Sequence, residues 1–161
     1  VTTGGLGTMG FGLGASIGAA LATGKHVVMV TGDGSFAMNM AELITAVDHH
    51  IPVTIVLVNN GVLGMVRQMQ SLFMRQRYSS TTLDRRVDYV ALTKATGAEA
   101  RRATTPEELD AALAWALATD GPALIECPID KDEFVTPVLQ IGASMDELIV
   151  NMDDVQARMG R

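Results

Sequence analysis

Runs of apolar residues alternate along this chain with stretches in which apolar side chains recur at helical spacing. Residues 26–31 and 53–58 are mainly apolar runs of strand length, and each is followed by turn-forming residues. Between them, residues 35–49 carry a helical stripe of apolar side chains at positions 36, 40, 43, 44 and 47. Because both strands are apolar on both faces, we expect central strands of a parallel sheet that helices cover.

The same alternation continues toward the carboxyl end. A small-residue helix is predicted before the first strand, and further elements follow the second: the predicted ranges are a helix over 10–23, a helix over 87–96, a strand over 98–103, a helix over 106–119 and a strand over 122–127. Thr105 is expected to cap the helix that begins at Pro106. The predicted fold class is therefore α/β, with a doubly wound, mostly parallel sheet and helices on both faces.

Domain organisation follows from where this rhythm stops. The 161 residues are 48% hydrophobic, which is ample for one packed core. We expect one domain over residues 1–130 and a carboxy-terminal tail over 131–161 that packs on the same domain. The chain opens at Val1 without an initiator Met or a leader-like segment. We therefore expect a fragment of a longer chain.

Charge and cysteine content narrow the function classes. The formal net charge is −6 and no Lys/Arg-rich run is present, which argues against nucleic acid or an anionic membrane as a partner. No segment reaches the roughly 18 consecutive apolar residues of a membrane span. Cys127 is the single cysteine, so no internal disulfide can form, and the sequence suits a reducing cytoplasm.

Two strand ends carry polar clusters suited to a metal ion and a phosphate. Gly32-Asp33-Gly34 follows the first strand, and Asn59-Asn60-Gly61 follows the second. If the strands are neighbours, a right-handed crossover places Asp33 and Asn60 side by side. In such sheets ligands bind at the carboxyl ends of the strands. Their carboxylate and amide oxygens suit Mg²⁺, and Val62 is the best-placed main-chain carbonyl in the loop that follows. Gly34 and Ser35 begin a helix whose free N–H groups suit a phosphate.

These residues carry a resemblance to a known family. Gly32-Asp33-Gly34, 24 intervening residues and Asn59-Asn60 resemble the thiamine diphosphate signature. The similarity is narrower still to acetohydroxyacid (acetolactate) synthases, which share several stretches with this chain in the same order. Those stretches are Gly4–Gly12, Gly32–Phe36, Asn59–Gly61, Gly64–Gln68 and Arg77–Ser79. The resemblance implies a carboxy-terminal thiamine diphosphate-binding domain with its tail, and so extends to the whole chain.

The resemblance also implies roles for individual residues. Asp33 and Asn60 would bind Mg²⁺ through side chains, and Val62 through its main chain. Met9 would support the bent cofactor behind its thiazolium ring. The remaining implied residues contact either the cofactor or the substrate: they are Gly7, Thr8, Gly32, Gly34, Ser35, Gly64 and Met65 at the cofactor, and Met65, Gln68 and Met69 at the substrate pocket. No residue of this chain is expected to transfer protons in the reaction, because the activating Glu belongs to a different domain.

The implied enzyme is an acetolactate synthase, a transferase that decarboxylates pyruvate and condenses the hydroxyethyl unit with a second 2-oxo acid. This reaction belongs to branched-chain amino acid biosynthesis. The resemblance implies thiamine diphosphate, Mg²⁺ and, in the full-length enzyme, FAD. Implied partners are the 2-oxo acids, the remaining domains of the subunit and further copies in a homodimer or tetramer. A regulatory small subunit is a further partner that the family allows. The isolated chain is expected to be inactive.

Other interpretations stay open at this point. Gly14 replaces the family's usual Pro and Met69 its usual Trp, which puts the helix start and the choice of second 2-oxo acid in doubt. A different thiamine diphosphate-dependent decarboxylase or carboligase, or a catabolic synthase, would show the same signature. The spacing Gly5-x-Gly7-x-x-Gly10 also matches a dinucleotide-binding fingerprint, although no strand precedes it. A non-catalytic interaction module is the third alternative.

Overall fold

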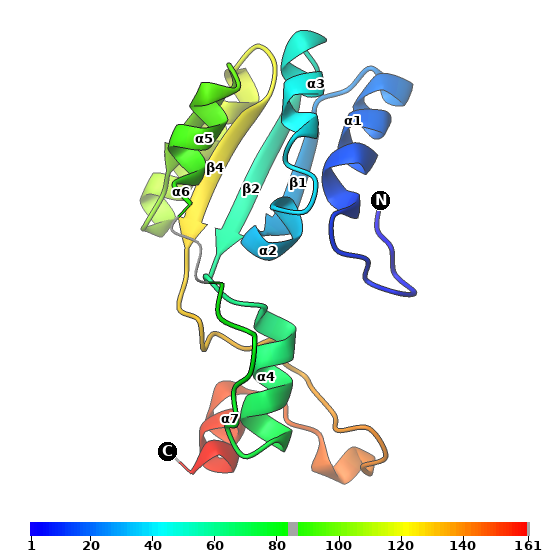
Figure 1. Ribbon diagram of the computed structural model, residues 1–161, viewed down its shortest axis with the longest axis vertical. Coiled ribbons are helices and arrows are strands. Elements are labelled where there is room, and N and C mark those ends of the chain that lie inside the picture. Colours follow the sequence, from blue (N-terminus) through cyan, green and yellow to red (C-terminus); the bar gives the residue numbers. More distant parts are fainter. Residues whose placement is uncertain (84–86, 161) are drawn as a thin grey trace. The chain divides into compact units, whose positions relative to one another are not determined.

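The computed structural model describes residues 1–83 and 87–160. Within these residues four parallel strands form one sheet in the order β1-β2-β4-β3 (Figure 1). The strands are β1 (Val27–Gly32), β2 (Val53–Asn59), β3 (Glu99–Arg102) and β4 (Ala123–Pro128). Gly32 is paired with Val58 across β1 and β2, and Asn59 with Pro128 across β2 and β4. The predicted α/β class and its parallel sheet are confirmed.

Helices cover both faces of this sheet, because successive side chains of a strand point to opposite faces. On one face α1 (Phe11–Thr23), α2 (Asp33–Phe36), α3 (Glu42–Asp48) and α5 (Tyr89–Ala95) supply buried residues to one apolar core. Ile55 and Leu124 represent the strands in that core. On the other face α6 (Pro106–Ala118) packs on Ala123 and Ile125. Alternate residues of β4 therefore belong to different cores.

β1 does not have the position that its sequence suggests. It pairs with β2 on one side and forms an edge of the sheet within the described residues. Met29 is buried, but Val28 and Val30, on the opposite face, are 49% and 71% exposed. The prediction that helices cover both faces of this strand is wrong here, because α1 packs on the Met29 face while α6 packs on β4. The same prediction holds for β2, whose residues are buried or half-buried throughout.

The predicted helix over residues 35–49 is interrupted. Residues 37–41 separate α2 from α3 and form turns, with Met38 N donating to Ser35 O and Glu42 N donating to Asn39 O. These bonds span three residues rather than the four of an α-helix. Phe36 and Leu43 are fully buried on either side of the break, while Ile44 is 50% exposed. The apolar stripe is therefore split between two short helices that reach the same core.

The boundaries of α5 and α6 follow local chemistry. Thr105 Oγ1 accepts a hydrogen bond from Glu108 N at 3.2 Å, and Pro106 is the first residue of α6, as expected from the sequence. Gly97 lies just beyond α5 at φ +92°, a left-handed conformation that favours glycine. Both helix ends are thus determined by residues next to them in the chain.

A second compact unit contains residues 61–83 and 130–160, whereas residues 1–60 and 87–129 make up the sheet unit. It holds α4 (Gly64–Phe73), the short 3₁₀ helix η1 (Met145–Glu147) and α7 (Met152–Met159). α4 and α7 lie side by side around a core that includes Leu72, Phe134 and Val155 (Figure 1). The sequence assigned residues 61–83 to the first domain. In the structure this segment groups with the tail instead, because α4 buries its apolar face against residues of the tail.

Candidate functional site

The predicted Mg²⁺ ligands Asp33 and Asn60 follow two paired strands. Asp33 is 4% exposed and begins α2 directly after β1, and Asn60 directly follows β2. Because β1 and β2 are parallel and Gly32 is paired with Val58, both strands finish at the same end of the sheet, and Asp33 and Asn60 directly follow them. One carboxylate and one amide therefore lie at the carboxyl ends of neighbouring strands. Their oxygens are the donors that Mg²⁺ prefers, so this pair fits the cation.

The glycine-rich amino-terminal segment adjoins the same edge. Gly10 N donates a hydrogen bond to Ser35 Oγ at 3.0 Å. Gly10 has φ +83°, and a Cβ on it would lie 3.2 Å from Met38 Cβ, so a side chain is disfavoured there. Met9, the preceding residue, is 44% exposed and offers apolar surface next to α2. The structure thus brings the predicted residues Met9 and Ser35 into one neighbourhood.

Gly7 and Thr8, predicted to contact the cofactor, form part of an amino-terminal turn. Gly7 N donates to Thr3 O at 2.8 Å, and Thr8 N donates to Thr3 Oγ1 at 2.8 Å. Gly7 has φ +58°. At the end of β1, a Cβ on Gly32 would lie 3.9 Å from Val58 O, which is ordinary van der Waals contact. Gly32 is therefore not required here by crowding within this chain.

Tyr89 supports the turn that carries Asp33, and the sequence did not single it out. Its hydroxyl donates to Asp33 O at 3.4 Å, and its ring packs edge-on against Phe36 with centroids 6.0 Å apart. Tyr89 is 3% exposed and is the first residue of α5. The signal in the sequence is weak, because one aromatic residue in a helix normally indicates only core packing.

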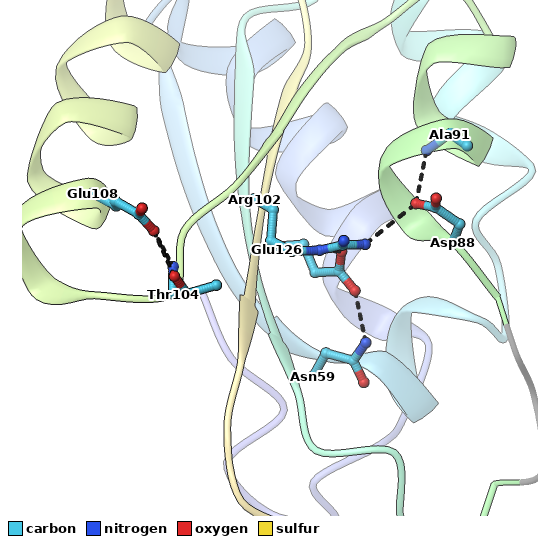
Figure 2. A network of polar contacts seen from close by, with 7 residues as sticks. All are labelled: Asn59, Asp88, Ala91, Arg102, Thr104, Glu108 and Glu126. Atoms are coloured by element: carbon cyan, nitrogen blue, oxygen red, sulfur yellow. Dashed lines mark hydrogen bonds and ion pairs between the residues drawn. The ribbon is translucent and has the colours of Figure 1, made fainter.

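Glu126 is the buried centre of a partly exposed polar network near the carboxyl ends of the strands (Figure 2). Its Oε1 accepts a hydrogen bond from Asn59 Nδ2 at 2.8 Å, and its Oε2 accepts one from Arg102 Nε at 2.8 Å. Glu126 is 3% exposed. Arg102 NH2 also lies 3.4 Å from Asp88 Oδ1, and Asp88 caps α5 by accepting from Ala91 N. The only sequence signal for this network is an acidic residue inside an apolar strand.

The network changes the acidity of two of its neighbours. The hydrogen bond to Glu126, and then its negative charge, raise the pKa of the Arg102 guanidinium. Burial raises the pKa of the Cys127 thiol, and the Glu126 charge raises it further. Arg102 is thus the cation that neutralises Glu126, and Cys127 is kept in its thiol form.

In the second unit, Arg67 and Gln68 of the Gly64–Gln68 motif are structural. Gln68 is 1% exposed, its Nε2 donates to Val135 O at 2.7 Å and its Oε1 accepts from Val135 N at 3.0 Å. Arg67, 7% exposed, bonds Asp132 through Nε at 2.8 Å and NH2 at 2.7 Å. Gln68 was expected to face the substrate pocket. In this structure both ends of its amide bond Val135 of the tail, and its place in the substrate pocket stays a prediction.

Met65, Met69 and Val62 occupy different surroundings in this unit. Met65 is 54% exposed, whereas Val62 is 4% exposed and forms an isolated antiparallel bridge with Thr82. Met69 lines a mainly apolar groove of about 550 Å³. The groove is lined by Val66, Met69, Gln70, Met74, Arg77, Tyr78 and Ser79. Gly64, the remaining predicted residue, begins α4.

Two features that the described residues lack concern other predictions. Residues 1–83 and 87–160 contain no helix that is long and apolar enough to cross a membrane. Over the same ranges no group of three or more His, Cys, Asp or Glu side chains has the arrangement of a metal site. A site built from one carboxylate, one amide and phosphate oxygens does not need such a group.

Known proteins share this sequence over most of its length. The family described as "Thiamine pyrophosphate enzyme, C-terminal TPP binding domain" matches residues 1–127. The acetolactate synthase isozyme 2 large subunit of Escherichia coli (strain K12) is 45% identical over 150 residues, which cover 92% of this chain and 27% of that protein. The mitochondrial acetolactate synthase catalytic subunit of Saccharomyces cerevisiae is 44% identical over 150 residues, which cover 92% of this chain and 22% of that protein.

A solved structure agrees with the fold. The thiamine diphosphate-dependent 4-hydroxybenzoylformate decarboxylase of Rhodococcus jostii RHA1 superposes with a TM-score of 0.70 at 32% identity, over 76% of this chain and 23% of that protein. The chain thus spans about a quarter of the length of its relatives. These relatives support the thiamine diphosphate interpretation and not the dinucleotide-binding one. The chain belongs to the thiamine pyrophosphate enzymes, as their C-terminal TPP-binding domain.

Proposed function

We propose that this chain binds the diphosphate end of thiamine diphosphate through an Mg²⁺ ion that Asp33 and Asn60 hold. The observation that carries the proposal is the pairing of β1 with β2, which brings the two residues to one edge of the sheet. The buried Asp33 carboxylate supplies negative charge, and Asn60 supplies a neutral oxygen. Val62, two residues beyond Asn60 in the chain, stays a predicted main-chain ligand.

Other residues would shape the surroundings of the cofactor. Ser35 and the glycines at positions 7, 32, 34 and 64 are predicted contacts, as is Thr8. Met9 offers apolar surface beside α2, and we assign it the support of the thiazolium ring. Met65 and Met69 are proposed to line the substrate pocket, and the apolar groove that Met69 lines supports the assignment of Met69.

The reaction we propose for the full-length protein is that of an acetolactate synthase in branched-chain amino acid biosynthesis. Thiamine diphosphate supplies the electron sink for decarboxylating a 2-oxo acid. This chain holds and orients the cofactor, and none of its residues is assigned a proton transfer. The identity of 45% and 44% to two acetolactate synthases over 92% of the chain supports this choice.

Several finer properties of the full-length protein are part of the same proposal. They are FAD as a second cofactor, a homodimer or tetramer, remaining domains that complete the site, a regulatory small subunit and a cytoplasmic location. The resemblance to acetohydroxyacid synthases supports the first four. The single cysteine supports the last, because it suits a reducing compartment.

Calorimetric titration of thiamine diphosphate tests the proposed site. The proteins are the 161-residue chain and a chimaera in which it replaces the matching quarter of the Escherichia coli isozyme 2 large subunit. We expect binding that requires Mg²⁺ and weakens at least tenfold, about 1.4 kcal/mol, in Asp33→Ala and in Asn60→Ala. Asp153→Ala, a change in α7, is the matched control and should bind normally. The proposal would be contradicted if neither the chain nor the chimaera bound thiamine diphosphate. Binding that does not depend on Mg²⁺ would also contradict it.

The chimaera also distinguishes the two candidate activities. The Rhodococcus neighbour is a decarboxylase, so a thiamine diphosphate-dependent decarboxylase is the second candidate. With pyruvate, we expect acetolactate from the chimaera and no product from the isolated chain, because the activating carboxylate is assigned to another domain. Acetaldehyde as the main product would favour the second candidate. Turnover by the isolated chain would contradict the assignment of that carboxylate.

A further inference from the structure

Glu126 joins the chain segments that lead to both proposed cation ligands. We propose that it is a positioning residue for the Mg²⁺ site, acting through Asn59 on Asn60 and, with Arg102, through Asp88 and Tyr89 on Asp33. This inference rests on the proposed function and adds residues that do not touch the cation themselves.

The branch toward Asn60 rests on two bonds between β2 and β4. Asn59 Nδ2 donates to Glu126 Oε1 at 2.8 Å, and Asn59 O accepts from Ile129 N at 2.9 Å. Asn59 is therefore held to β4 by both its side chain and its main chain, and it is directly bonded to Asn60. Because a peptide unit is planar, fixing Asn59 restricts where the next residue can go. The Glu126 carboxylate thereby limits the positions open to the Asn60 side chain.

The branch toward Asp33 passes through the first turn of α5. Arg102 bonds Glu126 through Nε at 2.8 Å and reaches Asp88 Oδ1 through NH2 at 3.4 Å. Asp88 caps α5, and the next residue, Tyr89, donates to Asp33 O at 3.4 Å. The side chain of Arg102 is 47% exposed and that of Asp88 61% exposed, so their ion pair is the weaker link. The Asn59 branch should dominate the effect on the cation.

The chemistry of the network requires a carboxylate at position 126. Asn59 Nδ2–H and Arg102 Nε–H are both donors, and a carboxylate offers an acceptor to each. In Glu126→Gln one acceptor becomes an NH₂ donor, so one of the two neighbours loses its bond whichever way the amide is turned. Loss of a partner at a buried polar site is costly, because water does not replace it there. Figure 2 shows Glu126 between its two donors.

Glu108 supplies a matched control in the same unit. Its carboxylate accepts from Thr104 N and Thr104 Oγ1, both at 2.7 Å, at the start of α6. In Figure 2 Glu108 and Thr104 stand apart from the Glu126 network, and no dashed line joins either residue to that network. Glu108→Gln therefore removes a hydrogen-bonded carboxylate of the same size without touching Asn59 or Arg102. Glu108 is exposed, so the effect of this substitution measures what the loss of a hydrogen-bonded carboxylate outside the network does to the site.

The experiment measures the dissociation constant for Mg²⁺ at saturating thiamine diphosphate, in the chain or chimaera that binds. We expect Glu126→Gln to weaken Mg²⁺ at least tenfold, as outer partners of metal ligands commonly do. Asn59→Ala should weaken it similarly, and the double variant no more than about either alone, since both changes break one path. Glu108→Gln should stay within twofold. High Mg²⁺ should restore normal thiamine diphosphate affinity in Glu126→Gln, which a damaged fold would not allow.

Two results would overturn the inference while leaving the proposed function in place. One is a twofold or smaller change in Mg²⁺ affinity for Glu126→Gln, even with a lowered melting temperature. The other applies if the Glu126→Gln protein does not fold. In that case, changes in Mg²⁺ affinity of twofold or less in both Asn59→Ala and Arg102→Lys would reject the inference. If the unaltered protein and Asp33→Ala both fail to bind Mg²⁺ with thiamine diphosphate, the proposed function falls and this inference with it.

Discussion

At the residue scale, two buried acidic side chains occupy the same edge of the sheet with different tasks. Glu126, 3% exposed, faces Arg102 and Asn59, so its charge is neutralised within the protein. Asp33, 4% exposed, lies at the end of β1 and is the proposed ligand of the cation. A buried carboxylate is stabilised by hydrogen bonds, by a positively charged side chain or by a metal ion. Arg102 is the charged side chain bonded to Glu126, and the proposed Mg²⁺ would add a positive charge beside Asp33.

Cys127 gives a test of this environment that is independent of any cofactor. Burial, and then the Glu126 charge, raise the pKa of its thiol. The folded chain should therefore react with a disulfide reagent at pH 8 more slowly than the unfolded chain, because the thiolate is the nucleophile. Glu126→Gln should move the midpoint of the rate–pH profile down, and burial should keep it above that of the unfolded chain.

The sign of the linked stability effect follows from the same shift. A thiol whose pKa is higher in the folded state stabilises the fold below its unfolded pKa, and this contribution is lost as the pH rises through the folded value. Denaturant titrations at rising pH, with Cys127→Ser as the control, measure it. A midpoint of the rate profile at or below that of the unfolded chain would contradict the prediction.

The residues of the site differ in how far the sequence reveals them. Asp33 and Asn60 follow apolar runs, and strand ends in parallel sheets are where ligands bind, so position alone marks them. Glu126 and Tyr89 act through contacts with residues far away in the chain, namely Asn59 and Asp33. For Gln68 a shared motif predicts a pocket residue, and the structure adds a contact that the motif does not reveal, the bonds of its amide to Val135. Local patterns nominate candidate ligand positions but do not reveal the contacts around them.

At the element scale, α1 shows which of its glycines a close approach requires. A Cβ on Gly12 would lie 2.7 Å from Met29 Cε, so Met29 would have to move. Gly14 and Gly18 would meet nothing within 4 Å. Among these three glycines the closest approach is at Gly12, where a Cβ would displace the end of the Met29 side chain.

Gly14→Ala should therefore stabilise the chain by about 0.5–1 kcal/mol, because alanine loses less backbone entropy than glycine inside a helix. Gly12→Ala should gain less or lose stability, since it displaces Met29. Urea denaturation of both variants measures the difference in the free energy of unfolding. Destabilisation by Gly14→Ala would show that the open space beside this residue is needed. It would also bear on the absence of the family's usual proline there.

Element types followed from periodicity more reliably than element surroundings did. α6 and its cap were predicted because Thr105 and Pro106 act locally. The break between α2 and α3 was missed, since both short helices reach the same core and so keep one apolar stripe. β1 was expected to be covered on both faces, yet Val28 and Val30 are exposed. Apolar composition predicts a strand, but the covering of a strand depends on distant residues.

At the scale of the whole molecule, the described residues divide into two compact units with separate apolar cores. The cores of the sheet unit draw on residues 1–60 and 87–129, and the core of the second unit draws on residues 61–83 and 130–160. The tail had no clear rhythm in the sequence, because its contacts are with α4 rather than with repeating elements of its own. Arg67 and Gln68 bond this tail through Asp132 and Val135.

Leu72→Ala tests whether the units are energetically separate. Leu72 is 7% exposed in the core of the second unit, so its truncation should cost that unit about 2–5 kcal/mol. Hydrogen exchange should then show reduced protection in α4 and α7, while β2 and β4 keep theirs, because local opening follows the contacts that are lost.

Leu117→Ala on α6 is the matched control, since Leu117 is 52% exposed and its loss should leave protection in both units nearly unchanged. Equal loss of protection in β2, β4 and α4 of the Leu72→Ala protein would mean that the chain opens as one cooperative body. The division of cores would then describe packing alone. Protection lost only in the second unit would instead mean that residues 61–83 and the tail can open while the strands that carry Asp33 and Asn60 stay folded.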